Sequence, residues 1–229
     1  MFPLKDNVPT RSFPIVTATL IAINAAVWLF YQLPDLNGSV LELAYQPCEV
    51  TSSCPPGAAM GEGWEVTWLT SMFMHGSWLH IIGNMIFLWV FGNNVEDAMG
   101  RLRFLAFYLL AGIAATALQT TVTLWMGTAE DAAVPNLGAS GAVSGVLGAY
   151  LVLLPHASVL TLVFYFLLEV PAALFLGFWF LFQLWEGGFS LLMPQEGGGV
   201  AFFAHIGGFV FGAATVRLWI KRPPLQPAY

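Results

Sequence analysis

Long apolar segments, separated by short polar ones, dominate this chain and predict helices that cross a membrane. A spanning helix takes about 20 apolar residues, and six runs approach or reach that length. They cover residues 14–33, 78–91, 102–125, 138–154, 171–185 and 200–220. The pattern predicts an all-α polytopic membrane protein: six transmembrane helices over residues 14–220, with short tails at residues 1–13 and 221–229.

The composition agrees with a membrane protein. Hydrophobic residues make up 58% of the 229 residues and charged residues only 9%, against roughly 25% charged in an average soluble domain. The first run is too long for the apolar core of a signal peptide, and no convincing small-residue cleavage site follows it. We therefore expect this run to be a retained helix.

The basic residues predict the orientation of the bundle. With six spans, all seven lie on one side of the membrane: Lys5, Arg11, Arg101, Arg103, Arg217, Lys221 and Arg222. Because loops rich in Lys and Arg stay inside, we expect a multi-pass plasma (inner) membrane protein with both termini in the cytoplasm. The basic residues border the membrane and form no patch, so the net charge of −6 indicates no nucleic-acid partner.

The first outer loop, residues 34–77, is long and contains aromatic residues such as Trp64 and Trp68. Tryptophan favours the membrane interface, so we expect this loop to fold back and lie partly in that interface. The loop also holds both cysteines, Cys48 and Cys54. An oxidising compartment would favour a disulfide between them. Two free thiols are the alternative, and the sequence leaves both open.

Two segments flank the fifth predicted helix. Residues 157–168 are apolar beyond what one span needs, and we expect them to lie along the inner surface, with the fifth helix beginning at Pro171. The outer loop at residues 186–199 has glycines at both ends. Such glycines suit a moving lid or any flexible connection. The fifth helix and this loop are our candidate for a gate.

Polar side chains lie near the outer ends of three predicted helices. Ser140 begins the fourth helix, where unpaired backbone N–H groups and the positive end of the helix dipole favour an oxyanion. His205 lies near the start of the sixth helix, and His80 and Asn84 share one face of the second. Polar groups at this depth indicate a functional site by default. A role in helix packing is the alternative for His80 and Asn84.

Small residues should let the helices that carry Ser140 and His205 approach each other. Glycines spaced three or four apart leave a helix face that is nearly bare backbone. The glycines concerned are Gly138, Gly141 and Gly145 on the fourth helix and Gly208 and Gly212 on the sixth. We therefore expect Ser140 to come within hydrogen-bond distance of His205.

These residues suit nucleophilic catalysis. A serine hydroxyl becomes a good nucleophile when a base takes its proton, and histidine can do this at neutral pH. Ser140 is predicted to be the nucleophile and His205 the base, while His80, Asn84 and the Ser140 N–H could stabilise an oxyanion. No helix carries a carboxylate at this depth to orient His205. The sequence therefore predicts a Ser/His dyad and not a triad.

Three stretches contain these residues: HGSWLHIIGN at 75–84, GASG at 138–141 and AHIGGFVFG at 204–212. Together they resemble the signature motifs of the rhomboid intramembrane serine proteases, and residues 93–104 resemble that family's loop between helices two and three. The resemblance implies the six-helix rhomboid core, with Ser140 as nucleophile, His205 as base, and His80 and Asn84 near the oxyanion. It also implies cleavage of single-span membrane-protein substrates near the outer boundary of the lipid bilayer, with no metal or cofactor.

The chain departs from the family at two places. Many members carry Trp-Arg in the first outer loop, where Val66 and Thr67 stand here. Some members place a tyrosine four residues after the serine to stack on the histidine, where this chain has Ser144. The sequence therefore leaves open how the first outer loop is anchored and how the His205 ring is held.

Two other functions are alternatives to proteolysis. A non-catalytic rhomboid-like protein that binds membrane helices has no need of both Ser140 and His205, yet this chain keeps both. A small transporter is disfavoured because the spans hold no deep charge and no repeated half. The sequence does not reveal the natural substrate or the oligomeric state.

Overall fold

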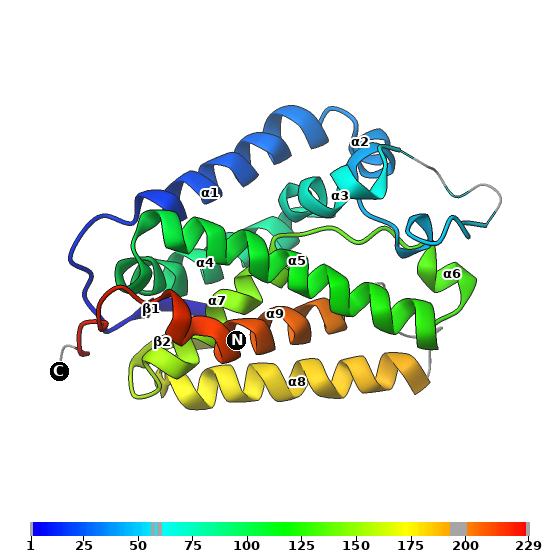
Figure 1. Ribbon diagram of the computed structural model, residues 1–229. Coiled ribbons are helices and arrows are strands. Elements are labelled where there is room, and N and C mark those ends of the chain that lie inside the picture. Colours follow the sequence, from blue (N-terminus) through cyan, green and yellow to red (C-terminus); the bar gives the residue numbers. More distant parts are fainter. Residues whose placement is uncertain (1, 56–57, 59–60, 193–200, 228–229) are drawn as a thin grey trace.

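The computed structural model of the chain describes residues 2–55, 58, 61–192 and 201–227. Figure 1 shows a bundle of long helices. The long segments are α1 (Ile15–Ala26), continued by the π-helical η1 (Val27–Gln32), then α4 (Trp78–Met99), α5 (Arg101–Met126), α7 (Ser140–Leu153), α8 (Ala172–Leu192) and α9 (Phe202–Trp219). Shorter helices connect them: α2 (Leu36–Leu43), η2 (Pro47–Glu49), α3 (Trp64–Thr70), η3 (Ser71–Phe73) and α6 (Ala129–Ala132).

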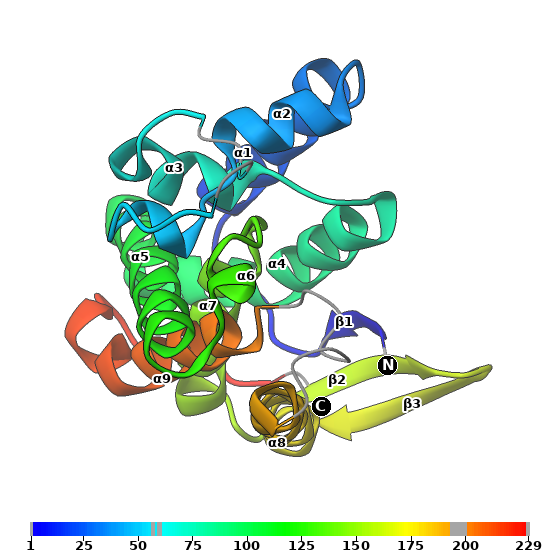
Figure 2. The same cartoon turned by 90° about the vertical axis from the view of Figure 1, so that its right-hand side faces the viewer.

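Helix α7 lies at the centre of the bundle. Ten consecutive residues, from Gly141 to Tyr150, are buried. The helix contacts α4, α5, α8 and α9, and Figure 2 shows it lying among them. A helix that is apolar on every side is typical of a buried position, with neighbouring helices covering all of its faces. The glycine-rich run therefore forms the core of the bundle, and Ser140, just before the buried residues, is half-buried.

Four helical segments in the described part of the chain are long and apolar enough to cross a membrane: Ile15–Gln32, Arg101–Met126, Ala172–Ser190 and Phe202–Trp219. Helix α7 is apolar but has only 14 residues. Helix α4 has 22 residues, and its last two turns carry polar residues such as Asn94, Glu96 and Asp97. The described residues thus contain four candidate spans, and a count of six stays a prediction.

Two buried carboxylates near the end of α4 bind the two ends of the chain. Asp97 accepts hydrogen bonds from Arg11 at 2.6 Å and from Arg222 at 3.1 Å. Glu96 accepts hydrogen bonds from the backbone N–H and the hydroxyl of Thr17, both at 2.8 Å. Buried charges are tolerated when they are paired and hydrogen-bonded. The segments before α1 and after α9 are therefore held against α4.

The structure adds a small sheet that the all-α prediction lacked. Strands β1 (Phe2–Asp6), β2 (Ser158–Val163) and β3 (Phe166–Pro171) are antiparallel, in the order β1-β2-β3. In Figure 2 the hairpin of β2 and β3 projects away from the bundle beside α8. Most of residues 157–168, which we expected to lie along the inner surface, form this hairpin. The expected N-terminal tail contributes β1, which pairs with β2 as the third strand of the sheet.

Local chemistry explains the hairpin. A short apolar run fits a strand or a helix equally well by pattern. Here the β-branched residues Val159, Thr161 and Val163 alternate along β2, which favours a strand. Phe164, with a φ of 53°, begins the turn. Pro171 closes β3, so the fifth helix begins one residue later than predicted, at Ala172.

Helix α8 is longer than its sequence pattern indicated. The loop expected at residues 186–199 is helical up to Leu192, and both Gly187 and Gly188 lie within the helix. The rest of that expected loop, residues 193–200, lies outside the described residues. The expectation of a loop is therefore wrong for residues 186–192, whereas the gate at the fifth helix stays a prediction.

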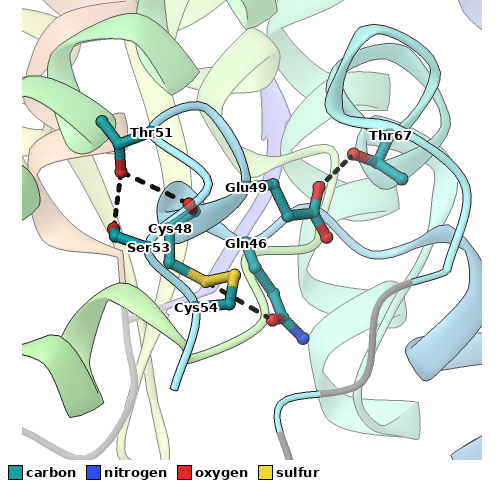
Figure 3. The surroundings of a disulfide bond; sticks show 7 residues. All are labelled: Gln46, Cys48, Glu49, Thr51, Ser53, Cys54 and Thr67. Atoms are coloured by element: carbon teal, nitrogen blue, oxygen red, sulfur yellow. Dashed lines mark hydrogen bonds between the residues drawn. A yellow bond between two sulfur atoms is a disulfide. The ribbon is translucent and has the colours of Figure 1, made fainter. Parts of the chain in front are cut away.

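The first outer loop is folded and contains a disulfide. Cys48 and Cys54 are bonded, with their Cα atoms 4.8 Å apart, so of the two alternatives the structure contains the disulfide. Figure 3 shows the bond beside Gln46, with Glu49 reaching Thr67 of α3. The Thr67 hydroxyl donates to Glu49 at 3.4 Å. This contact helps to anchor α3 at Thr67, one of the two positions where the resemblance left the anchoring open.

Asp6 ends β1 and is buried against α7. Its carboxylate accepts hydrogen bonds from the Tyr150 hydroxyl at 2.6 Å and from the Val8 N–H at 3.4 Å. Burial raises the pKa of Asp6 to about 6, and the hydrogen bonds offset this effect only in part. The native state therefore binds a proton at Asp6 more readily than the unfolded chain does.

We expect this carboxyl to make stability depend on pH. Folding raises the pKa of Asp6 from 3.8 to about 6. Its contribution to the free energy of unfolding is therefore fully present below the unfolded pKa and is lost as the pH rises through the folded pKa. Asp6→Asn should remove this dependence while keeping an acceptor for Tyr150. Thermal unfolding in detergent, followed from about pH 4 to pH 8, would check it, and parallel pH profiles for the two proteins would contradict it.

Candidate active site

Ser140 is the first residue of α7, and a glycine delivers the chain to it. Gly138 has a φ of 128°, a conformation that other residues rarely adopt. A Cβ at Gly138 would also lie only 2.7 Å from Nε2 of His80. The Gly138 N–H donates to the Ser71 carbonyl at 2.9 Å, which fixes the approach. Gly138 thus allows the turn into α7 and leaves room for the imidazole of His80.

Ser140 and His205 meet across the α7–α9 interface. The Ser140 Oγ lies 2.8 Å from Nε2 of His205. His205 lies in the first turn of α9, so both residues are at the same end of adjacent helices. A contact of this length is the geometry in which an imidazole can take a hydroxyl proton.

The glycines of α9 make this contact possible. A Cβ on Gly208 would overlap the carbonyl oxygen of Gly141, and a Cβ on Gly212 would overlap that of Gly145. The α7 glycines face a third helix as well, because a Cβ on Gly141 would lie 2.6 Å from that of Ala115 in α5. Helices α5, α7 and α9 therefore pack at distances that only small residues allow.

The other ring nitrogen of His205 contacts a residue that the sequence analysis did not single out. Nδ1 lies 2.8 Å from Oε1 of Gln183 in α8. The imidazole also lies beside two aromatic rings, with its centroid 6.0 Å from that of Trp179 and 6.5 Å from that of Phe202. The signal that could have found Gln183 is a lone amide in an otherwise apolar run.

His80 and Asn84 lie one turn apart on α4 and face the same cavity as Ser140. Nδ1 of His80 accepts a hydrogen bond from the Gly76 N–H at 3.4 Å. Asn84 is 8% exposed, and its side-chain amide nitrogen has no hydrogen-bond partner among the described residues. A buried donor without a partner is costly. It therefore marks a place where a ligand oxygen would be favoured.

These side chains line one cavity of about 610 Å³. Its polar residues come from α4, α7, α8 and α9 and include His80, Asn84, Ser140, Gln183 and His205. Among the described residues that line it, none is Asp or Glu. The described part of the chain also contains no group of three or more His, Cys, Asp or Glu that could hold a metal ion.

His75, in the loop before α4, supports the wall of the site. It is fully buried, and its backbone is held by Gln32, which donates to the His75 carbonyl and accepts from its N–H, both at 2.8 Å. Burial lowers the pKa of His75 to about 3, so its ring is neutral. The imidazole packs edge-on against His80, with centroids 5.1 Å apart.

Ser144, the other departure from the motif pattern, bonds to its own helix. Its hydroxyl donates to the backbone carbonyl of Ser140 at 2.6 Å. Serine and threonine commonly bond back to the preceding helical turn in this way. The Nδ1 side of the His205 ring is thus held by Gln183 of α8, with Trp179 and Phe202 beside the ring, and not by Ser144.

The close helix packing gives a prediction about stability. Gly208→Ala should destabilise the protein, because the added methyl overlaps backbone that cannot move aside, and such overpacking costs about 1–3 kcal/mol. Gly177 of α8 is the matched control. Apart from its own helical turn, no described residue lies within 4 Å of a methyl added there. Gly177→Ala should be neutral or stabilising. Thermal unfolding in detergent would compare them, and equal melting temperatures would contradict the packing argument.

Known proteins resemble this chain along most of its length. Residues 61–222 match the family model described as the Rhomboid domain. Rhomboid protein 1, mitochondrial, of Saccharomyces cerevisiae is 30% identical over 196 residues, which cover 84% of this chain and 50% of the yeast protein. The putative rhomboid protease YdcA of Bacillus subtilis is 31% identical over 153 residues, 66% of this chain and 69% of that protein.

A human relative extends the comparison. The presenilin-associated rhomboid-like protein, mitochondrial, of Homo sapiens is 27% identical over 217 residues, 90% of this chain and 50% of the human protein. The chain thus spans about half the length of its yeast and human relatives. With the family model matching well over half of its residues, the chain belongs to the rhomboid family.

Proposed function

We propose that this protein is an intramembrane serine endopeptidase that cleaves transmembrane segments of membrane proteins near the outer membrane boundary. The observation that carries the proposal is the 2.8 Å contact between Ser140 Oγ and His205 Nε2. Ser140 and His205 line a cavity of about 610 Å³, which is also lined by Asn84, whose amide nitrogen has no partner among the described residues. Membership of the rhomboid family supports the same activity.

The proposed reaction begins when a peptide carbonyl enters the cavity beside Ser140. His205 Nε2 takes the hydroxyl proton as Oγ attacks the carbonyl carbon. The resulting oxyanion accepts hydrogen bonds from the Ser140 N–H and from the Asn84 amide, with the His80 imidazole beside it. His205 then gives its proton to the leaving nitrogen. Water, activated by the same imidazole, finally releases the acyl group and restores Ser140.

The substrates proposed are single-span membrane proteins. A substrate helix must unwind locally to present a carbonyl, and lipid cannot satisfy the backbone groups that unwinding frees. Segments weakened by glycine, proline or other poor helix formers should therefore be cleaved best. The cavity suits such a segment because its lining is mainly apolar, with Leu79, Phe87 and Trp179 among the residues.

We also propose the predicted topology of six spans, plasma-membrane location and both termini in the cytoplasm. The clustering of basic residues supports this orientation. Arg11 and Arg222 share Asp97, and Arg103 donates to the Ile220 carbonyl at 3.3 Å, all at one end of the bundle. The yeast and human relatives are named mitochondrial. The plasma-membrane location is therefore proposed separately from the orientation of the helices.

Loss of either proposed dyad residue should abolish proteolysis. Ser140→Ala removes the nucleophile and His205→Ala removes the base, and each should lower cleavage of a model transmembrane substrate by about 10³-fold or more. The substrate would carry glycine and proline near its outer boundary and be reconstituted in liposomes. His156→Ala is the control, because this histidine is exposed at the far end of α7 and should retain full activity.

Two outcomes would contradict the proposed activity. Undiminished cleavage by the folded Ser140→Ala protein would exclude the assigned nucleophile. A wild-type protein that neither cleaves nor reacts at Ser140 with a fluorophosphonate probe would favour a non-catalytic helix-binding member of the family.

The topology can be tested separately. A reporter enzyme that is active only outside the cytoplasm should be inactive when fused after Arg222 and active when inserted after Thr128. These positions should lie on opposite sides of the membrane because the basic residues gather at one end. Activity of the fusion after Arg222 would contradict the proposed orientation.

A further inference from the structure

We propose that Gln183 of α8 is a positioning residue that holds His205 in the tautomer and ring orientation needed to activate Ser140. This inference rests on the proposed protease function and assigns the support of the base to one side chain. The juxtaposition is direct, since Oε1 of Gln183 lies 2.8 Å from Nδ1 of His205 while Nε2 of the same ring lies 2.8 Å from Ser140 Oγ.

The two contacts together define the tautomer. For Nε2 to accept the hydroxyl proton of Ser140, it must carry a lone pair, so a neutral His205 must carry its hydrogen on Nδ1. That hydrogen needs an acceptor, and the amide oxygen of Gln183 provides one. The opposite tautomer would place a hydrogen on Nε2 and leave the ring unable to take the proton. The amide oxygen thus favours the reactive form.

Among the groups around His205, Gln183 is the one placed to accept the Nδ1 hydrogen. The polar and titratable groups that face the ring are His80 from α4, Ser140 from α7 and Gln183 from α8. Among the described residues that line the cavity none carries a carboxylate. Ser144 is occupied by the Ser140 carbonyl, and the aromatic neighbours Trp179 and Phe202 can limit ring tilt but cannot accept the Nδ1 hydrogen as a carbonyl oxygen does.

The location of Gln183 shows that its contact is not incidental. Gln183 is 5% exposed and lies in the otherwise apolar first part of α8, residues 172–185. Burying an amide costs free energy unless it is hydrogen-bonded, so α8 can keep Gln183 at this position because His205 satisfies it. The amide of Gln183 replaces the carboxylate of a triad, orienting the imidazole without adding a charge to an apolar site.

The experiment measures the reaction of Ser140 with a fluorophosphonate probe across a pH series in detergent. Gln183→Met keeps the length and shape of the side chain but removes the acceptor. Since misorienting a reacting group by about 1 Å can cost 10²-fold, we expect the maximal inactivation rate constant to fall roughly 10- to 100-fold, with little change in the concentration of probe at half-saturation. A purely structural role would lower the fraction of folded protein instead.

Gln183→Glu is the conservative variant. It keeps an acceptor oxygen beside Nδ1 and adds a negative charge next to the imidazole. An opposite charge at this distance raises the pKa of a histidine by about 1–3 pH units. We therefore expect labelling to be retained within a fewfold of wild type, with the acidic limb of its pH profile moved upwards. Loss of folded protein would lower labelling at every pH and would not move the acidic limb of the profile.

Gln119 of α5 offers the matched control. It is a glutamine beside the same turn of α9, accepting a hydrogen bond from the Ala204 N–H at 3.1 Å, but it does not touch the His205 ring. Gln119→Met should reduce stability while leaving the pH profile of the folded protein at wild type. Equal losses of labelling in Gln119→Met and Gln183→Met would overturn the positioning role.

The outcomes separate this inference from the proposed function. If wild type reacts at Ser140, Ser140→Ala does not, and folded Gln183→Met reacts like wild type with the same pH profile, the positioning role is overturned and the protease assignment stands. Failure of wild type itself to react would instead overturn the proposed function. A selective rate loss in Gln183→Met with recovery in Gln183→Glu supports the inference.

Discussion

The contact of backbone with backbone between α7 and α9 is the constraint on which the rest of the site depends. In lipid, helices gain little from burying apolar side chains against each other and associate mainly through close packing. Gly208 and Gly212 bring α9 against the carbonyls of Gly141 and Gly145. Because Ser140 and His205 occupy the first turns of these two helices, the glycines below them set the distance between hydroxyl and imidazole.

Around that pair, several buried polar groups have hydrogen-bond partners, whereas both ring nitrogens of His75 have none among the described residues. Gln183 satisfies one nitrogen of His205, Ser144 satisfies the carbonyl of Ser140, and Gln32 holds the backbone of His75. The Asn84 amide has no such partner in the described part of the chain. An interior of low dielectric strengthens every hydrogen bond that is made and penalises each one that is not. The unpartnered amide therefore marks the position where a substrate oxygen would gain most.

The helical organisation and the members of the proposed site could be predicted from the sequence because both leave local patterns. Apolar runs indicate helices, glycines four apart indicate close packing, and polar residues near the ends of such runs indicate a site. Ser140, His205, His80 and Asn84 were found in this way. Their actual approach depends on how the helices cross, which no spacing specifies.

Other features escaped the sequence for physical reasons. The β2–β3 hairpin lies in a short apolar run, for which strand and helix patterns coincide. Gln183 is a single amide with no partner at a helical spacing, and its contact with His205 exists only through the placement of α8 beside α9. The bond between Cys48 and Cys54 required that the loop bring two Cα atoms to 4.8 Å, a tertiary outcome that residue counting left open.

The way α8 is fastened has a mechanical consequence. Its first residues are tied down, with Ala172 N–H bonded to the Ala157 carbonyl at 2.7 Å and Phe175 stacked on Phe91. Farther along, the Gln183 amide contacts His205, and Phe182 and Trp185 are exposed. A tilt of α8 about its first turn would therefore move the later residues farthest. Gln183 lies about 16 Å along α8 at 1.5 Å per residue, so a tilt of only ~10° about the first turn would carry its amide about 3 Å from the imidazole and break its contact with Nδ1.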